Sequence, residues 1–286
     1  MTTKKFSTFE YAAEVLEGKS PEEGLYLQDA FESSKGYVFV IVEAPAKGEA
    51  QGRLAETVIE RIKYYFESES EDSAGEITKN ALIYTSGYLY HGWQNDQKAK
   101  PVGISCLCVL FDKEKIYFSR IGEACMAVLT GKKMHPIMLP GNSSSPVGED
   151  NISGYLGEEA EIDPEISLQP SSPAKDDILL FSSGALCEYI MSRQVRKVIA
   201  DSMPLQTKLS RILRFVRDDN GSQSAAAFMI CFYGVGNKQA AYWKGDKQLP
   251  DDGDSGLKAK IMGKSRKSAS GSKPPGKRQS GSKSKG

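Results

Sequence analysis

The sequence predicts an α+β protein built as a four-layer α-β-β-α sandwich, in which helices flank two stacked antiparallel sheets. Strands such as GYVFVIV (36–42) and DILLF (177–181) are apolar without alternation, so both of their faces must be covered. Helical patterns are few and fall into two clusters, too few to cover both sides of one large sheet. Alternating βαβ units are absent, so a doubly wound parallel sheet is not expected.

The first half of the chain begins this pattern with one strand and two helices. After the strand at 36–42, apolar residues recur at helical spacing over about 50–67 and over about 75–92. These residues are Leu54, Val58, Ile62 and Tyr65 in the first helix and Ile77, Ala81, Tyr84 and Tyr88 in the second. We interpret Tyr88, Tyr90 and Trp93 as packing residues rather than a platform on which nucleic-acid bases stack.

Strands then follow one another closely. They are predicted at 104–111, 115–121, 124–131 and 134–139. The links DKEK and GE between the first three are so short that antiparallel hairpins are expected at both. A long polar segment runs from 141 to 165 before the next apolar strand.

The last third of the domain supplies one more helix between two buried strands. After DILLF, helical spacing returns in Leu205, Leu209, Ile212, Leu213 and Val216. Pro204 precedes this helix and Asn220-Gly221 ends it, as helix start and stop signals do. AAAFMICFY (225–233) is the final buried strand, and AAYW (240–243) is expected to extend the sheet. We therefore predict one domain over residues 1–247.

The acidic and basic residues are distributed unevenly along the chain, although their numbers are equal. Of its 286 residues, 37 are basic and 37 acidic, but all acidic residues precede Leu257 and ten basic residues follow it. The domain side therefore carries a net charge of −10 and the end of the chain +10. From 248 to 286 the sequence reads as an acidic linker followed by a basic tail rich in Ser, Gly and Lys. Such a tail buries too little apolar surface to fold, so we predict that it is disordered.

Composition also excludes several function classes. No run of about eighteen apolar residues exists, and the N-terminus lacks the apolar core of a secretion signal, so a cytoplasmic protein is expected. The five cysteines are odd in number and contain no CxxC pair, which favours buried, reduced thiols. Neither histidine has metal-ligand spacing, so a zinc site and a cysteine–histidine nucleophile are not expected.

Five segments, taken in order, carry a resemblance to a known family. They are GLYLQDAF (24–31), YVFVIVEAP (37–45), SRIGEACMAVL (119–129), DDILLFSSGALCEYI (176–190) and GSQSAAAFMICF (221–232). With the predicted architecture, they resemble the metal-dependent protein phosphatases of the type-2C (PPM) family over roughly residues 20–235. The resemblance implies the PPM-type sandwich fold, with a catalytic site between its two sheets.

The resemblance also implies a metal centre, most of whose carboxylates this sequence lacks. In the family, two Mg²⁺ or Mn²⁺ ions polarise a bridging water that attacks phosphorus in line. Asp29 keeps one acid, but Gln28 stands where Glu is common, and Gly24 falls at the phosphate-binding Arg position. The other vestigial metal positions, where the family has Asp, are held by Glu43, Glu123, Gly184 and Gln223.

These replacements predict no catalytic residue, no phosphate-binding residue and no metal cofactor. The sequence therefore favours a catalytically inactive, PPM-type phosphatase-like protein that acts as a regulatory or binding pseudoenzyme in signalling. Its expected partner is a regulatory protein or a phosphoprotein. An atypical metal-dependent serine/threonine phosphatase is the alternative, and it would need Mg or Mn, with one ion held by Asp29, Glu43 and Glu123.

A third hypothesis assigns the function to the basic tail, with nucleic acid or another polyanion as its partner. The residues expected to contact the polyanion are Lys264, Arg266, Lys267, Lys273, Lys277 and Arg278. Clustered cations without neighbouring acids attract phosphates whatever the sequence of the nucleic acid. In this hypothesis the folded domain only carries the tail.

Overall fold

A computed structural model describes residues 2–6, 8–18, 24–44, 49–69, 71–94, 103–139, 154–167, 172–220 and 224–233. The chain divides into two units, Met1–Gln248 and Leu249–Gly286, and every described residue belongs to the first. The predicted strand at 240–243 and the predicted disordered tail therefore lie outside the described residues. None of the helices within the described ranges is long and apolar enough to cross a membrane.

Two antiparallel sheets form the centre of the domain. Sheet A has, in spatial order, β1 (Thr2–Lys5), β2 (Phe9–Leu16), β11 (Ala225–Phe232), β10 (Ile178–Gly184), β7 (Ala124–Thr130) and β8 (Lys133–Met138). Sheet B has β3 (Leu25–Ser33), β4 (Gly36–Ala44), β5 (Ser105–Asp112), β6 (Lys115–Ile121) and β9 (Glu165–Ile166). Every neighbouring pair is antiparallel, including β5 and β6, which the short DKEK link predicts to form a hairpin.

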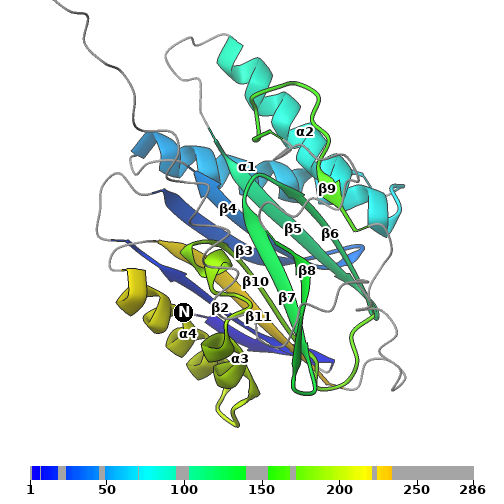
Figure 1. The fold of residues 1–286 in the computed structure, drawn as a ribbon. Helices are drawn as coiled ribbons and strands as arrows, with labels where there is room; N and C mark the ends of the chain where they lie inside the picture. Colours follow the sequence, from blue (N-terminus) through cyan, green and yellow to red (C-terminus); the bar gives the residue numbers. More distant parts are fainter. Residues whose placement is uncertain are drawn as a thin grey trace, which may run out of the picture. The chain divides into compact units, whose positions relative to one another are not determined.

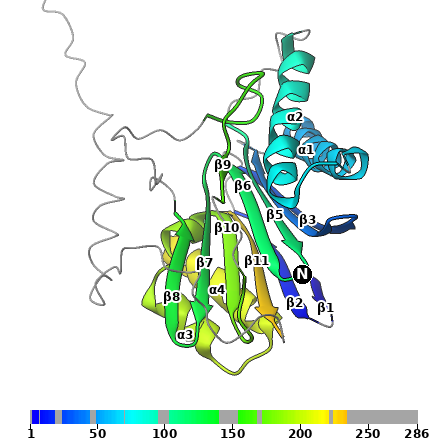
Figure 2. The same cartoon turned by 90° about the vertical axis from the view of Figure 1, so that its right-hand side faces the viewer.

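Helices cover the outer face of each sheet. The helices α1 (Glu49–Ser68) and α2 (Ala74–Gln94) lie on sheet B, whereas α3 (Arg193–Ala200) and α4 (Leu205–Asn220) lie on sheet A (Figure 1). A view turned by 90° shows the two helix pairs on opposite outer sides of the sheets (Figure 2). The predicted four-layer α-β-β-α architecture is confirmed.

Three apolar layers hold the four structural layers together. One lies between sheet A and its helices, one between sheet B and its helices, and one between the sheets. The strands are apolar on both faces because one face of each sheet packs against helices and the opposite face packs against the second sheet. The layer between the sheets is rich in aromatic rings, and Phe39 packs against the rings of Phe181 and Phe228.

The GE link between β6 and β7 is not a hairpin, and this prediction was wrong. Strand β6 pairs with β5 and β9 in sheet B, whereas β7 pairs with β10 and β8 in sheet A. Gly122 has a φ of 74°, in the left-handed region that glycine tolerates, so the chain can turn sharply out of sheet B. The Oγ of Ser105 accepts a hydrogen bond from the Glu123 backbone N–H at 3.1 Å and holds this crossing in place.

Several elements were not predicted from the sequence. Strands β1 and β2 complete sheet A, and β2 pairs along its whole length with β11, so the fold begins well before residue 20. The sequence of β2, FEYAAEVL, mixes alanines and glutamates with apolar residues, which hides the strand signal. Helix α3 has only eight residues, too few for a clear helical period.

Candidate functional site

Three of the predicted vestigial positions gather at one end of the layer between the sheets. Glu43 lies near the end of β4, Glu123 in the link between β6 and β7, and Gly184 at the end of β10. The side chain of Glu43 faces sheet A, because its β4 neighbours Val42 and Ala44 pack toward the helices on the other face. The charge of Glu123 and the backbone N–H of Gly184 both act on Glu43.

Tyr26, which the sequence did not single out, is the partner of Glu43. The two residues lie directly opposite each other on β3 and β4. The Tyr26 hydroxyl donates a hydrogen bond of 2.9 Å to Oε1 of Glu43. Oε2 of Glu43 is enclosed and has no hydrogen-bond partner among the described residues. A neutral phenol, rather than a cation, therefore faces the most buried carboxylate of this cluster.

Burial governs the protonation of Glu43. Its pKa is raised from 4.5 to about 7, mainly by loss of solvent and to a smaller extent by the negative charge of Glu123. The hydrogen bonds from Tyr26 and from the Gly184 backbone act in the opposite direction. The same acids also raise the pKa of Tyr155, after the larger effect of its own burial. Glu43 and Glu123 therefore both act on the buried groups at this end of the layer.

Gly184 is tightly enclosed. A Cβ at this position would lie 2.6 Å from the Ser224 carbonyl oxygen, 2.7 Å from the Tyr26 hydroxyl and 2.8 Å from a carbon of the Tyr26 ring. Its φ of 68° also lies in the region that favours glycine. Position 184 therefore lacks both a carboxylate and the room for one.

Asp29 does not join the other vestigial positions. It lies on the opposite face of sheet B, where it forms an ion pair with Lys63 of α1. Its Oδ1 accepts a hydrogen bond of 2.8 Å from the Ala30 backbone N–H. Side chains alternate along a strand, so when Tyr26 and Gln28 point toward sheet A, Asp29 must point toward the helices.

Gln28 connects the two sheets. In the amide orientation that satisfies both neighbours, it donates to the Ala227 carbonyl at 3.1 Å and accepts from the Glu14 backbone N–H at 2.8 Å. Both groups belong to sheet A. Of the two remaining positions, Gly24 lies against the Ala44 carbonyl, 2.8 Å from where its Cβ would be, and Gln223 lies outside the described residues.

Arg120 supports the same end of the layer from β6. One guanidinium nitrogen donates to the Ala124 carbonyl at 2.6 Å, and another forms an ion pair with Glu165 of β9. The Arg120 side chain is only 7% exposed, so the pair is largely shielded from water. Sequence reasoning missed this residue. Its signal in the sequence was a basic residue between Ser119 and the apolar Ile121 near the end of a strand.

The fold is shared with known bacterial enzymes. The serine/threonine phosphatase of S. agalactiae superposes with a TM-score of 0.65 at 13% identity, over 78% of this chain and 99% of that one. Stp1 from Staphylococcus aureus superposes with a TM-score of 0.62 at 15% identity, over 82% of this chain and 98% of that one. PstP/Ppp from Mycobacterium tuberculosis superposes with a TM-score of 0.62 at 12% identity, over 79% of this chain and 99% of that one. The sequence matches no protein-family model and no curated protein.

This chain has the PPM-type phosphatase fold. The catalytic domain of PstP, one of these structural neighbours, was determined in complex with 2 manganese ions. A PPM-type centre requires several carboxylates converging on the ions. In the described residues no group of three or more His, Cys, Asp or Glu side chains is arranged to hold a metal ion.

The residues present do not fit a two-ion centre. Gly184 supplies no ligand, and Asp29 lies on the other face of sheet B. The Gln28 amide is hydrogen-bonded to sheet A, and Oε1 of Glu43 is bonded to Tyr26. Of the vestigial positions that the structure describes, Glu43 and Glu123 have carboxylates near one another, and two carboxylates are too little charge for two divalent cations.

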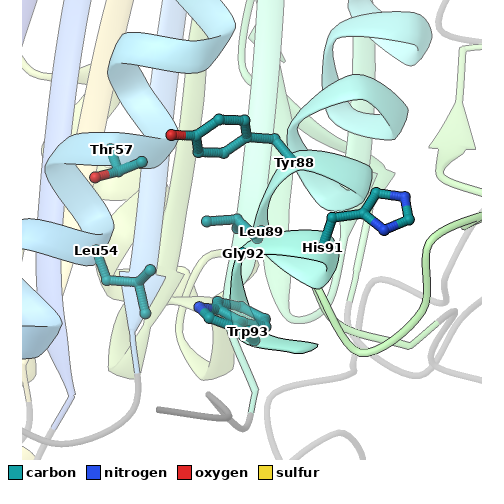
Figure 3. A pocket seen from close by; sticks show the side chains of 7 residues that line it. All are labelled: Leu54, Thr57, Tyr88, Leu89, His91, Gly92 and Trp93. Carbon is teal, nitrogen blue, oxygen red and sulfur yellow. The ribbon is translucent and has the colours of Figure 1, made fainter. Parts of the chain in front are cut away.

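The aromatic residues of α2 lie outside this cluster, whereas the charges of Glu43 and Arg120 act on the buried Cys187 thiol. Four of the five thiols are buried and the fifth is partly buried, and all five are free, as predicted. A groove of about 500 Å³ lies between α1 and α2 (Figure 3). It is lined by Leu54 and Thr57 of α1 and by Tyr88, Leu89 and Trp93 of α2. Trp93 packs on Gly157, as predicted for a packing residue, whereas Tyr88 is 44% exposed and lies under the Arg61 guanidinium.

Proposed function

We propose that this chain is a catalytically inactive, phosphatase-like pseudoenzyme that acts by binding a regulatory protein or phosphoprotein. The observation that carries the proposal is Gly184, where the family resemblance places an aspartate and where this chain offers neither a carboxylate nor space for one. Metal-assisted hydrolysis needs ions that polarise the attacking water and neutralise the charge that develops on phosphorus. The neutral Tyr26 hydroxyl cannot supply that charge.

The first experiment measures hydrolysis by the full-length protein. An aryl phosphate and a phosphoserine peptide are incubated with Mg²⁺, with Mn²⁺ and with EDTA. We expect the rate to equal that of buffer under all three conditions. Turnover that rises with Mn²⁺ and is lost in both Glu43→Gln and Glu123→Gln would overturn the proposal and would favour the atypical phosphatase.

A second experiment addresses the partner. The full-length protein is immobilised and exposed to a cell extract before and after treatment with an active phosphatase. If the partner is a phosphoprotein, retention of the same protein should fall after treatment. Retention that is unchanged favours a regulatory partner recognised without its phosphate. If nothing is retained from either extract at low salt, the binding proposal fails.

A second candidate activity is polyanion binding by the basic tail. The ten cations after Leu257, with no acid among them, support this proposal. Counterion release gives a slope of log K against log salt of roughly −0.7 to −0.9 for each neutralised phosphate. Engagement of about five phosphates would weaken binding on the order of a hundredfold between ~50 and ~200 mM salt.

The test compares three proteins in a salt titration with single- and double-stranded DNA. They are the full chain, the isolated tail and a chain that ends at Gln248. We expect the shortened chain to lose binding and the isolated tail to bind most tightly, because the acidic domain competes with DNA for the tail. Equal binding by the shortened and full chains would exclude the tail as the site.

A further inference from the structure

The contact between Tyr26 and Gly184 joins the two sheets. Tyr26 belongs to β3 of sheet B, and Gly184 ends β10 of sheet A. The Tyr26 ring and hydroxyl lie within 2.8 Å of the point where a Cβ of residue 184 would be. Real Cβ atoms do not approach other atoms so closely, so only glycine at 184 admits the ring in this position.

The third neighbour of that point is fixed. The Ser224 carbonyl, 2.6 Å from the same point, accepts a hydrogen bond from the Ala185 backbone N–H at 3.2 Å. A side chain at 184 could therefore be relieved only in part, by movement of Tyr26. A large residue on β3 and a missing side chain on β10 thus complement each other across the layer.

The hydroxyl end of Tyr26 completes the arrangement. The catalytic domain of PstP, which shares this fold, was determined in complex with 2 manganese ions, and carboxylate oxygens are the usual ligands of such cations. Here Tyr26 donates to Glu43, and Gln28, the next inward-facing residue of β3, bonds to Ala227 and Glu14 of sheet A. Two neutral side chains of one strand therefore bridge to acids or backbone groups at this end of the layer between the sheets.

We propose that Tyr26 and Gly184 form a matched structural pair, in which the tyrosine ring and hydroxyl take the place of a metal ion at the end of the inter-sheet layer. The pair makes the folded domain independent of divalent cations. It also means that Gly184→Asp alone cannot restore a metal site, since the new side chain would collide with Tyr26. This inference goes beyond the proposed function, because a protein can lose catalysis without filling the site.

A double-mutant cycle on the full-length protein tests the pair. Gly184→Ala, Tyr26→Ala and the double variant are unfolded with urea. The matched control is Gly131→Ala, because Gly131 has a similar φ of 60° but open space around it. Gly184→Ala should reduce the folding equilibrium constant roughly 10- to 100-fold more than the control, which is the usual cost of overpacking.

The coupling between the two positions decides the outcome. In the Tyr26→Ala background, the reduction of the folding equilibrium constant by Gly184→Ala, beyond that of the control, should be at least several-fold smaller than in wild type. Part of the reduction should persist, because the Ser224 contact remains. Tyr26→Phe should keep most of the coupling, because the ring is retained. Effects of Tyr26→Ala and Gly184→Ala that simply add would overturn the proposed pair.

A metal titration provides a second measurement, whose expected result is read from the wild-type protein alone. The thermal midpoint of the full-length protein is measured with EDTA and with millimolar Mn²⁺, and sensitised Tb³⁺ luminescence is recorded. We expect no shift of the midpoint and no saturable luminescence. A saturable rise in the midpoint with Mn²⁺ that disappears in Glu43→Gln would overturn the inference. Since hydrolysis is measured separately, failure here and failure of the proposed function can be distinguished.

Discussion

The centre and one end of the layer between the sheets are built from the same strands but from different chemistry. At the centre, Phe39 packs against four rings, with centroid distances between 5.2 and 6.2 Å. At the end, the same strand β4 presents Glu43, bonded to Tyr26 and facing Gly184. The centre is an ordinary apolar core, whereas the end holds polar groups with incomplete partners.

This difference explains how the fold persists at 12–15% identity to its structural neighbours. Stability comes mainly from apolar burial, which tolerates exchange among apolar residues of similar volume. Glu43, Glu123 and Gly184 lie at the end of the layer, outside this aromatic centre. We expect mutations at the centre to affect stability most and mutations at the end to affect pH dependence and local order.

The largest effect is expected from Phe39→Ala. This change removes a buried ring that contacts both sheets and should lower the free energy of unfolding by about 3–5 kcal/mol. Urea denaturation measures the loss. The matched control is Tyr64→Ala, which removes a ring that is 52% exposed and should cost less than about 1 kcal/mol. Equal losses would mean that the aromatic centre does not dominate stability.

The next largest effect is expected in the pH dependence of stability, which Glu43 causes. Its pKa of about 7 in the folded protein exceeds its ordinary value of 4.5, so the folded state binds the proton more tightly. The protonated Glu43 therefore stabilises the folded state fully below pH 4.5. This contribution to the free energy of unfolding is lost as the pH rises toward 7, by up to about 3 kcal/mol.

The Glu43→Gln variant removes this titration. The difference in unfolding free energy between wild type and variant should change across pH 4.5 to 7 and should be flat above it. At pH 8 the variant should be at least as stable as wild type. A difference that is constant from pH 4 to pH 8 would show that Glu43 titrates normally.

A smaller loss is expected from Arg120→Ala. The change leaves Glu165 without its cation and the Ala124 carbonyl without its donor. Since Glu165 is 27% exposed, water offsets part of the cost, and we expect a loss of about 2 kcal/mol. Glu165→Gln, which keeps an acceptor for Arg120, should cost less. Hydrogen exchange should show faster opening of β9 in the alanine variant only.

The smallest effect is expected from Asp29→Ala. The Asp29–Lys63 pair is more than a third exposed on both sides, and such surface pairs contribute less than about 1 kcal/mol. The stability change should also disappear at high salt. A loss as large as that of Arg120→Ala would show that the Asp29–Lys63 pair contributes more than an exposed surface pair does.

The sequence by itself determined the architecture. Apolar runs without alternation, such as those of β4, β10 and β11, can be stable only when both faces are covered, and this requirement led directly to two stacked sheets. The resemblance of three segments to family motifs pointed to Glu43, Glu123 and Gly184. The apolar runs depend on composition within one segment, which is visible without knowing its neighbours.

Only the tertiary structure decided which side chains meet. Asp29 faces α1, and Tyr26 fills the space beside Gly184, because the register of β3 against β4 assigns alternate residues to opposite faces. Likewise, the GE link changes sheets because Gly122 adopts a positive φ beside Ser105 of a distant strand. Pairing between residues far apart in the chain sets these contacts, so the local sequence pattern does not contain them.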